Sequence, residues 1–184
     1  MPRIKGINLT HTRAFLESAF GFEGWATAAA EMTPAARAAM DGVVAVGWYP
    51  GELHTELLRA MEVTLSARDR DVVPHAGAFA AEYDVSRIHR ILFRGLNPGL
   101  LLEKATDIWG RYYESGKWQI ERPSSTTTAA SLSDFSIVDA RYCRFLAGYF
   151  LRMFELVGAK DVRVRHTRCR ARGDAVCRYD GEWR

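Results

Sequence analysis

The sequence predicts an α+β fold, in which an N-terminal helical body packs with a C-terminal four-stranded antiparallel unit of order β-β-α-β-β. Apolar residues recur at helical spacing through most of residues 1–114. Residues 117–122 and 161–166 instead alternate between apolar and polar, as strands with one buried face do. A chain of 184 residues, 48% of them hydrophobic, can bury a core of its own, so we expect one domain over 1–184. Its helical part should cover 1–114 and its sheet-and-helix part 115–184.

Two short helices are expected near the N-terminus. Thr10 has the residue type of an N-cap for a helix over residues 10–20, which Gly21 should end. A second helix is expected from about residue 22 to residue 32, and it should carry Trp25. Residues 4–9 would then form a short apolar lead-in.

The helical pattern continues through the rest of the body. Thr33 followed by Pro34 predicts an N-cap and first turn for a helix that ends at Asp41-Gly42. Leucines and a methionine at helical spacing predict an amphipathic helix over 52–65. Two more helical stretches are expected: about 73–96, interrupted near Asp84, and 100–114, with Asn97-Pro98-Gly99 between them.

The period changes after residue 115. A hairpin is expected from 117–122 and the threonine-rich segment 126–135. A helix should follow over 137–157, ended by Gly158. The last two strands are expected at 161–166 and about 175–179, with the turn at Gly173-Asp174 between them.

The charge of the chain argues against a nucleic-acid partner. The formal net charge is only +3, and its excess lies in residues 160–184, which hold eight Lys or Arg against four Asp or Glu. Nucleic-acid binding by charge needs a larger basic surface. We find neither a signal peptide nor a long apolar span, so we expect a cytoplasmic protein with no membrane contact.

Three cysteines and a histidine near the C-terminus form a candidate zinc site. Closed zinc sites take four thiolate or imidazole ligands in a tetrahedron. An alternative is that the cysteines are small buried apolar residues and the histidine a hydrogen-bonded core residue. The four candidate ligands are Cys143, His166, Cys169 and Cys177.

Two local features decide whether these ligands can meet. Cys169 and Cys177 lie four residues on either side of Gly173, so a hairpin centred there would place them opposite each other. His166 and Cys169 are three residues apart and would face opposite sides of a regular strand. The strand must therefore end or bulge at Thr167-Arg168 for both to reach one ion.

The stretch CRFLAGYFLRMFELVGAKDVRVRHTRCRARGDAVCRYDGEW, from Cys143 onward, resembles the core of the vinyl-4-reductase domain. That family includes proteins of bacteriochlorophyll synthesis and the aromatic-sensing part of phenol-responsive activators. The resemblance implies a structural zinc held by a cysteine at the head of the helix, an acidic residue and two further cysteines. Cys143, Cys169 and Cys177 match the cysteine positions. His166 stands where the family has its acidic ligand.

The front half resembles the haem nitric-oxide/oxygen-binding domains, which have similar length and the same general α+β architecture. Lys5-Gly6-Ile7 and the run Phe20-Gly21-Phe22-Glu23-Gly24-Trp25 carry this resemblance. Haem in those domains needs a proximal histidine and a Tyr-x-Ser-x-Arg motif. The chain lacks that motif, which argues against haem.

Several aromatic residues and one histidine are candidates for lining a ligand pocket. Pockets for small molecules are mostly apolar, with a few polar groups that fix orientation. Aromatic residues at helical spacing are also common in ordinary cores, and a histidine beside isoleucines can be a boundary residue. The candidates are His89, Trp109, Tyr112, Tyr113, Tyr149 and Phe150.

The sequence therefore predicts a non-enzymatic sensory domain that binds an apolar or aromatic small molecule and carries a structural zinc. We find no glycine-rich phosphate loop, nucleophile motif or paired carboxylates, so no catalytic residue is expected. A homodimer is expected, with a possible signalling partner protein. Two alternatives stay open: a tetrapyrrole-related enzyme or chaperone, and a plain dimerising interaction module.

Overall fold

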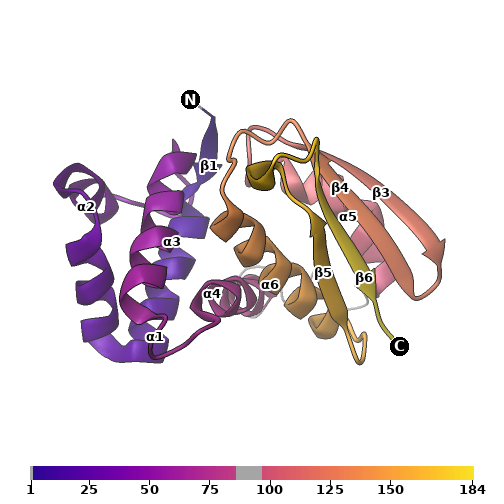
Figure 1. Cartoon of the computed structure of the whole chain (residues 1–184), viewed down its shortest axis with the longest axis horizontal. Coiled ribbons are helices and arrows are strands. Elements are labelled where there is room, and N and C mark those ends of the chain that lie inside the picture. The colour runs from indigo at the N-terminus through magenta and orange to yellow at the C-terminus, as the bar shows by residue number, and fades with distance from the viewer. Residues whose placement is uncertain (1, 86–96) are drawn as a thin grey trace.

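A computed structural model describes residues 2–85 and 97–184 and confirms the α+β fold (Figure 1). Helices α1–α3 form the N-terminal body, the sheet lies at the other end, and α4 and α6 lie between them. The helices are α1 (Gly6–Glu31), α2 (Pro34–Asp41), α3 (Gly51–Leu65), α4 (Val72–Tyr83), α5 (Pro98–Trp109) and α6 (Ala140–Leu156). The strands are β1 (Arg3–Lys5), β2 (Trp48–Pro50), β3 (Lys117–Ser124), β4 (Thr127–Ser133), β5 (Arg163–Arg168) and β6 (Cys177–Glu182). Among the described residues, no helix combines the length and apolar character needed to cross a bilayer.

Helix α1 begins earlier than the sequence predicts. It starts at Gly6, and Thr10 is not its N-cap, since the Thr10 hydroxyl donates to the Ile7 carbonyl at 3.2 Å. The first amides of a helix need acceptors from outside it. Here the Gly6 and Ile7 amides donate, each at 2.9 Å, to the carbonyls of Gly47 and Ala45 in the segment before β2. A tertiary contact thus replaces the side-chain cap.

The break expected at Gly21 is a kink inside α1. Gly21 has φ 73°, in the left-handed region that favours glycine, and helical geometry resumes after it. The predicted cap of the next helix is confirmed, because the Thr33 hydroxyl accepts from the Ala36 amide at 3.3 Å and Pro34 opens α2. Strands β1 and β2 pair antiparallel and tie the start of α1 to the start of α3.

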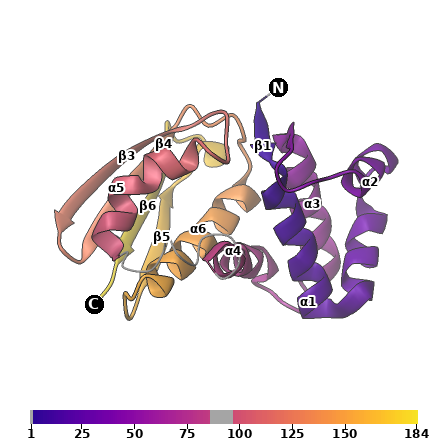
Figure 2. The ribbon, with the colours of Figure 1, turned by 180° about the vertical axis from the view of Figure 1, so that it is seen from behind.

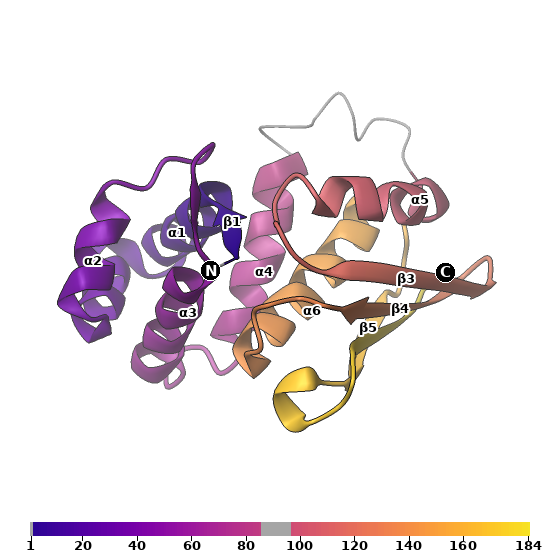
Figure 3. The same ribbon diagram turned by 90° about the horizontal axis from the view of Figure 1, so that it is seen from above.

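The C-terminal unit is a four-stranded antiparallel sheet of order β3-β4-β6-β5. Helix α5 lies beside β3, as seen from behind in Figure 2. Seen from above, α5 and α6 lie on the same face of the sheet, with α4 beyond α6 (Figure 3). The sheet therefore has one face covered by helices, and that face is where a cavity can form.

Helices α4 and α6 touch backbone to backbone. A Cβ atom added at Gly77 of α4 would lie 2.0 Å from the Phe145 carbonyl oxygen, and one added at Gly148 of α6 would lie 2.0 Å from that of Pro74. Small residues permit such close approach, because any side chain would overlap the opposite backbone. The two glycines thus set the distance between the two central helices.

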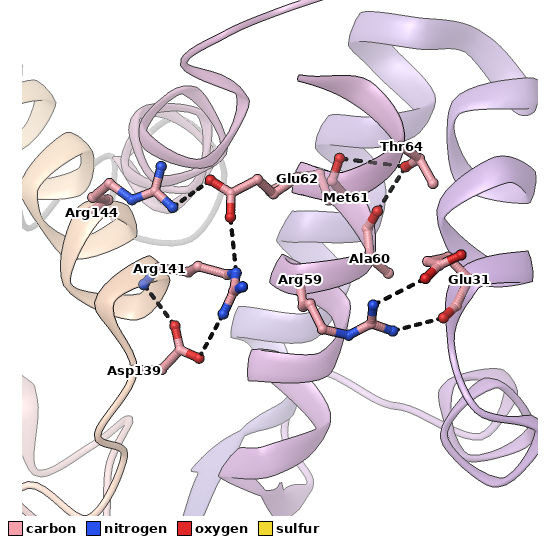
Figure 4. Close-up of polar contacts among 9 residues, drawn as sticks. All are labelled: Glu31, Arg59, Ala60, Met61, Glu62, Thr64, Asp139, Arg141 and Arg144. Carbon is pink, nitrogen blue, oxygen red and sulfur yellow. Dashed lines mark hydrogen bonds and ion pairs between the residues drawn. The ribbon is translucent and has the colours of Figure 1, made fainter. Parts of the chain in front are cut away.

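A charged cluster links the N-terminal body to α6 (Figure 4). Glu62 of α3 accepts from Arg141 Nε at 2.9 Å and from the Arg144 guanidinium, both at the start of α6. Partial burial raises the pKa of Glu62, but the hydrogen bonds and charges of Arg144 and Arg141 outweigh it and lower the pKa overall. On the other side of α3, Arg59 pairs with Glu31 of α1 at 3.0 Å. Helix α3 is therefore held by charge on both sides.

We expect Gly148→Ala to lower the free energy of unfolding by about 3 kcal/mol, because the added methyl group meets a backbone carbonyl that cannot turn away. Urea denaturation measures this loss. Gly110→Ala is the matched control: it follows α5 with helical angles, and the nearest atom to its new Cβ is 3.9 Å away. Equal stability of the two variants would contradict the backbone contact.

Candidate functional site

An apolar cavity lies between the sheet and helices α1, α4, α5 and α6. Its volume is about 120 Å³, below the range of roughly 300–1,000 Å³ that is usual for small-molecule sites. The five described residues expected to line a pocket all lie in its wall: Trp109, Tyr112, Tyr113, Tyr149 and Phe150. The sixth, His89, lies outside the described residues.

Periodicity explains which side chains reach the cavity. On each strand of the sheet, alternate residues face the helices. Trp118 and Ile120 of β3 and Thr128 and Ala130 of β4 are such pairs, two residues apart. On α6 the lining residues recur every three or four positions, as one helix face requires. These are Leu146, Tyr149, Phe150, Met153 and Phe154.

Three polar side chains meet in this apolar wall. Asp84, at the end of α4, accepts a hydrogen bond on Oδ2 from the Tyr149 hydroxyl at 2.9 Å. Its Oδ1 lies 3.5 Å from His11 Nδ1 of α1, a distance and orientation that make no hydrogen bond. Asp84 and His11 are each only 4% exposed. The cavity therefore contains a buried carboxylate with one unpartnered oxygen.

Burial shifts both titrating groups away from their charged forms. Desolvation raises the pKa of Asp84 to about 6, although the hydrogen bond from Tyr149 opposes the shift. Desolvation also lowers the pKa of His11 to about 4. At neutral pH His11 is therefore neutral and Asp84 is mostly ionised. The carboxylate has no cationic partner among the described residues that line the cavity, because none of these is a lysine or an arginine.

His11 is absent from the residues predicted to form a site, and Asp84 is predicted only to interrupt a helix, although both have a signal in the sequence. His11 stands at i+4 from Ile7 and i−4 from Phe15, and all three are buried. Asp84 continues a buried row through Gly77 and Ala80 of α4. A polar residue on the apolar face of a helix is a candidate for a buried polar site.

The four candidate metal ligands lie close together and form a second candidate site. The ligand atoms of Cys143, His166, Cys169 and Cys177 all lie within 4.8 Å of one another. The Cys143 sulfur is 3.6 Å from that of Cys177 and 3.9 Å from that of Cys169. Cys143 comes from the first turn of α6, and the other three from β5, β6 and their connection.

A bulge and a tight turn bring these residues together. The register of β5 on β6 shifts between His166 and Arg168, where the sequence required an irregularity. The connection differs from a simple hairpin, because a 3₁₀ turn (Arg170–Arg172) follows Cys169. Gly173 closes it with φ 98°, and the Asp174 carboxylate accepts from the Cys169 amide at 2.6 Å.

The electrostatics of this cluster favour thiolate character at one sulfur. The hydrogen bond with Cys143, with smaller contributions from His166 and from the Arg170 amide, lowers the pKa of Cys177 to about 4. The same contact raises the pKa of Cys143. The Nε2 atom of His166 is buried without a hydrogen-bond partner, while its ring stacks on Tyr179 at 4.7 Å. Three sulfurs and a ring nitrogen of His166 converge, a donor set that suits zinc.

The fold is that of the H-NOX domains. A solved H-NOX protein from K. algicida, Fe(II) unliganded, matches with a TM-score of 0.71 at 14% identity, covering 98% of this chain and 97% of that one. One from S. oneidensis in the Fe(II)NO state has a TM-score of 0.73 at 17% identity, with 98% and 99% covered. An oxygen-binding H-NOX domain related to soluble guanylate cyclases has 0.68 at 8% identity, with 98% and 95% covered. No family model matches the sequence, and no curated protein does.

The sequence-based argument against haem is wrong, because the domains that share this fold bind haem. The absence of one motif shows only that one way of holding the haem carboxylates is missing. The wall of the cavity is aromatic and carries a neutral imidazole, His11, and groups of this kind suit the ring of a porphyrin. The described lining residues do not fit the two haem carboxylates, for which they supply no cation.

We expect Asp84→Asn to stabilise the folded protein at neutral pH. The folded pKa of Asp84, about 6, lies above its ordinary value of 3.8, so the ionised form destabilises the fold above about pH 6. This penalty is at most about 3 kcal/mol and vanishes below the unfolded pKa. Thermal unfolding at about pH 7.5 should therefore show a higher Tm for the variant, and at about pH 4 no gain. A gain of equal size at both pH values would contradict the assignment.

Proposed function

We propose that this chain is a non-enzymatic, small-molecule-binding sensory domain and that its ligand binds in the cavity between the sheet and helices α1, α4, α5 and α6. The cavity itself carries the proposal: its wall is apolar and aromatic, and its few polar groups converge. The shared fold of the H-NOX domains supports it, since one of those domains was solved in the Fe(II)NO state and another as an oxygen complex.

The wall of the cavity favours a flat apolar or aromatic ligand. Trp109 stacks on Tyr113 with ring centroids 3.9 Å apart and meets Trp118 edge to face. Phe150 meets Trp118 in the same way. Rings held in this manner present faces and edges against which a planar molecule can pack. Haem belongs to this class of ligand, and so do smaller aromatic molecules.

A ligand in this cavity would touch both parts of the chain. Ile7, Asn8 and His11 come from α1, whereas most of the wall comes from α5, α6 and the sheet. A ligand that fits one arrangement of these parts better than another shifts the population toward it. We propose that such a shift is reported through a homodimer or to a partner protein.

We expect Ala105→Phe to weaken ligand binding at least tenfold, because residue 105 lines the cavity and the larger ring occupies it. N-phenyl-1-naphthylamine, a neutral apolar dye, reports binding by its fluorescence, and haemin by its Soret band. Thr106→Phe is the matched control, since residue 106 is exposed on the same helix. Equal affinity of the dye for the two variants would show that the dye binds outside this cavity.

The second part of the proposal is a structural zinc held by Cys143, His166, Cys169 and Cys177. Their mutual distances and the buried His166 Nε2 atom support it. Four protein ligands leave no open position on the metal, so the ion would stabilise the fold and take no part in chemistry. The cysteine spacing supports a vinyl-4-reductase type of domain, a finer assignment for which no family model matches.

We expect purified protein to contain about one zinc per chain and Cys169→Ser to lose it, because a hydroxyl is a much poorer zinc ligand than a thiolate. Elemental analysis measures the metal. A strong zinc chelator should lower the Tm of the unmodified protein and leave that of Cys169→Ser unchanged. This second measurement separates loss of zinc from the cost of altering a buried residue. Full zinc content in Cys169→Ser would rule out the site.

A further inference from the structure

We propose that the cavity selects ligands that join an aromatic body to a protonated amine, and that Asp84 is the residue that binds the amine. The inference rests on the proposed function, because it assigns a ligand class to the same cavity. It draws on the one buried acid among the described lining residues and on the partners that this acid lacks.

Only one oxygen of the Asp84 carboxylate has a hydrogen-bond partner. Tyr149 donates to Oδ2 at 2.9 Å, and Oδ1 has no hydrogen-bond partner although the residue is buried. Buried polar atoms are almost always paired, so an orphan acceptor that lines a cavity indicates a donor that the cavity receives. The Nδ1 atom of His11 lies 3.5 Å from Oδ1, but it makes no hydrogen bond to it.

The missing partner should carry positive charge. An ionised carboxylate in an apolar wall is costly unless a cation or several donors compensate it. His11 is kept neutral by its own burial and cannot supply that charge at neutral pH. The described lining residues include no lysine or arginine. A ligand ammonium would supply both the charge and the donor, and charge-assisted hydrogen bonds are the stronger kind.

The rings near Asp84 suit the same ligand. Tyr149 and Tyr112 line the cavity, and burial first and the Asp84 charge second raise the pKa of both hydroxyls, so both rings lie within electrostatic reach of Asp84. Cations bind favourably over the faces of aromatic rings. The same carboxylate would repel an anionic ligand, so carboxylic acids and phosphates of equal size should be rejected.

Three naphthalene probes of nearly equal size test this selection: 1-naphthylmethylamine, 1-naphthalenemethanol and 1-naphthoic acid. Calorimetric titration of the full chain at about pH 7.5 gives the Kd of each. We expect the amine to bind at least tenfold more tightly than the alcohol and the acid to bind most weakly. In Asp84→Asn the preference for the amine should disappear while the Kd of the alcohol changes little. Glu82→Gln is the matched control, since it removes an exposed carboxylate from the same helix.

The outcomes separate the two proposals. Equal binding of the amine and the alcohol to the unmodified protein would overturn the selection, and so would an amine preference that survives in Asp84→Asn. If that equal binding were lost in Ala105→Phe, the cavity would still be the ligand site. If none of the three probes bound the unmodified protein, the ligand cavity itself would be contradicted together with its selectivity.

Discussion

Helices α4 and α6 lie in direct backbone contact, and the positions of both candidate sites follow from it. Gly77 and Gly148 leave no room for a side chain between the helices. With this distance fixed, Asp84 at the end of α4 meets Tyr149 of α6 at hydrogen-bond length. The first turn of α6 carries Cys143 to the sulfurs of the β5–β6 connection. One packing contact therefore places two groups of polar residues that are chemically unrelated.

Helix α6 is also the element through which the rest of the fold is connected. On its outer side, Arg141 and Arg144 donate hydrogen bonds to Glu62 of the N-terminal body. Its inner side forms part of the cavity wall. The cavity is thus bounded by a helix whose position depends on packing, charge and the thiol cluster together. Cavities with apolar walls persist only where the surrounding elements cannot collapse into them. Here three kinds of interaction keep α6 from moving inward.

The sequence predicts those features whose causes are local. The cap at Thr33, the break at Gly21 and the alternation in β3 and β5 depend on neighbouring residues, and their positions agree with the structure. The required bulge after His166 could be anticipated because strand geometry alone places residues three apart on opposite faces. The grouping of the four metal-ligand candidates then depends on the hairpin and on one helix, which the spacing already suggested.

Other features have causes that lie far away in the chain. The start of α1 depends on carbonyls at residues 45 and 47, so no cap residue marks it. His11 and Asp84 are separated by more than seventy positions, and only tertiary packing brings them to one cavity. The cavity wall combines residues of α1, of β6 and of several elements between them, so no short contiguous fragment of the chain contains it. If the two halves of this chain were expressed separately, each would expose its part of the apolar lining to water. The binding space would form only when the two halves reassociate.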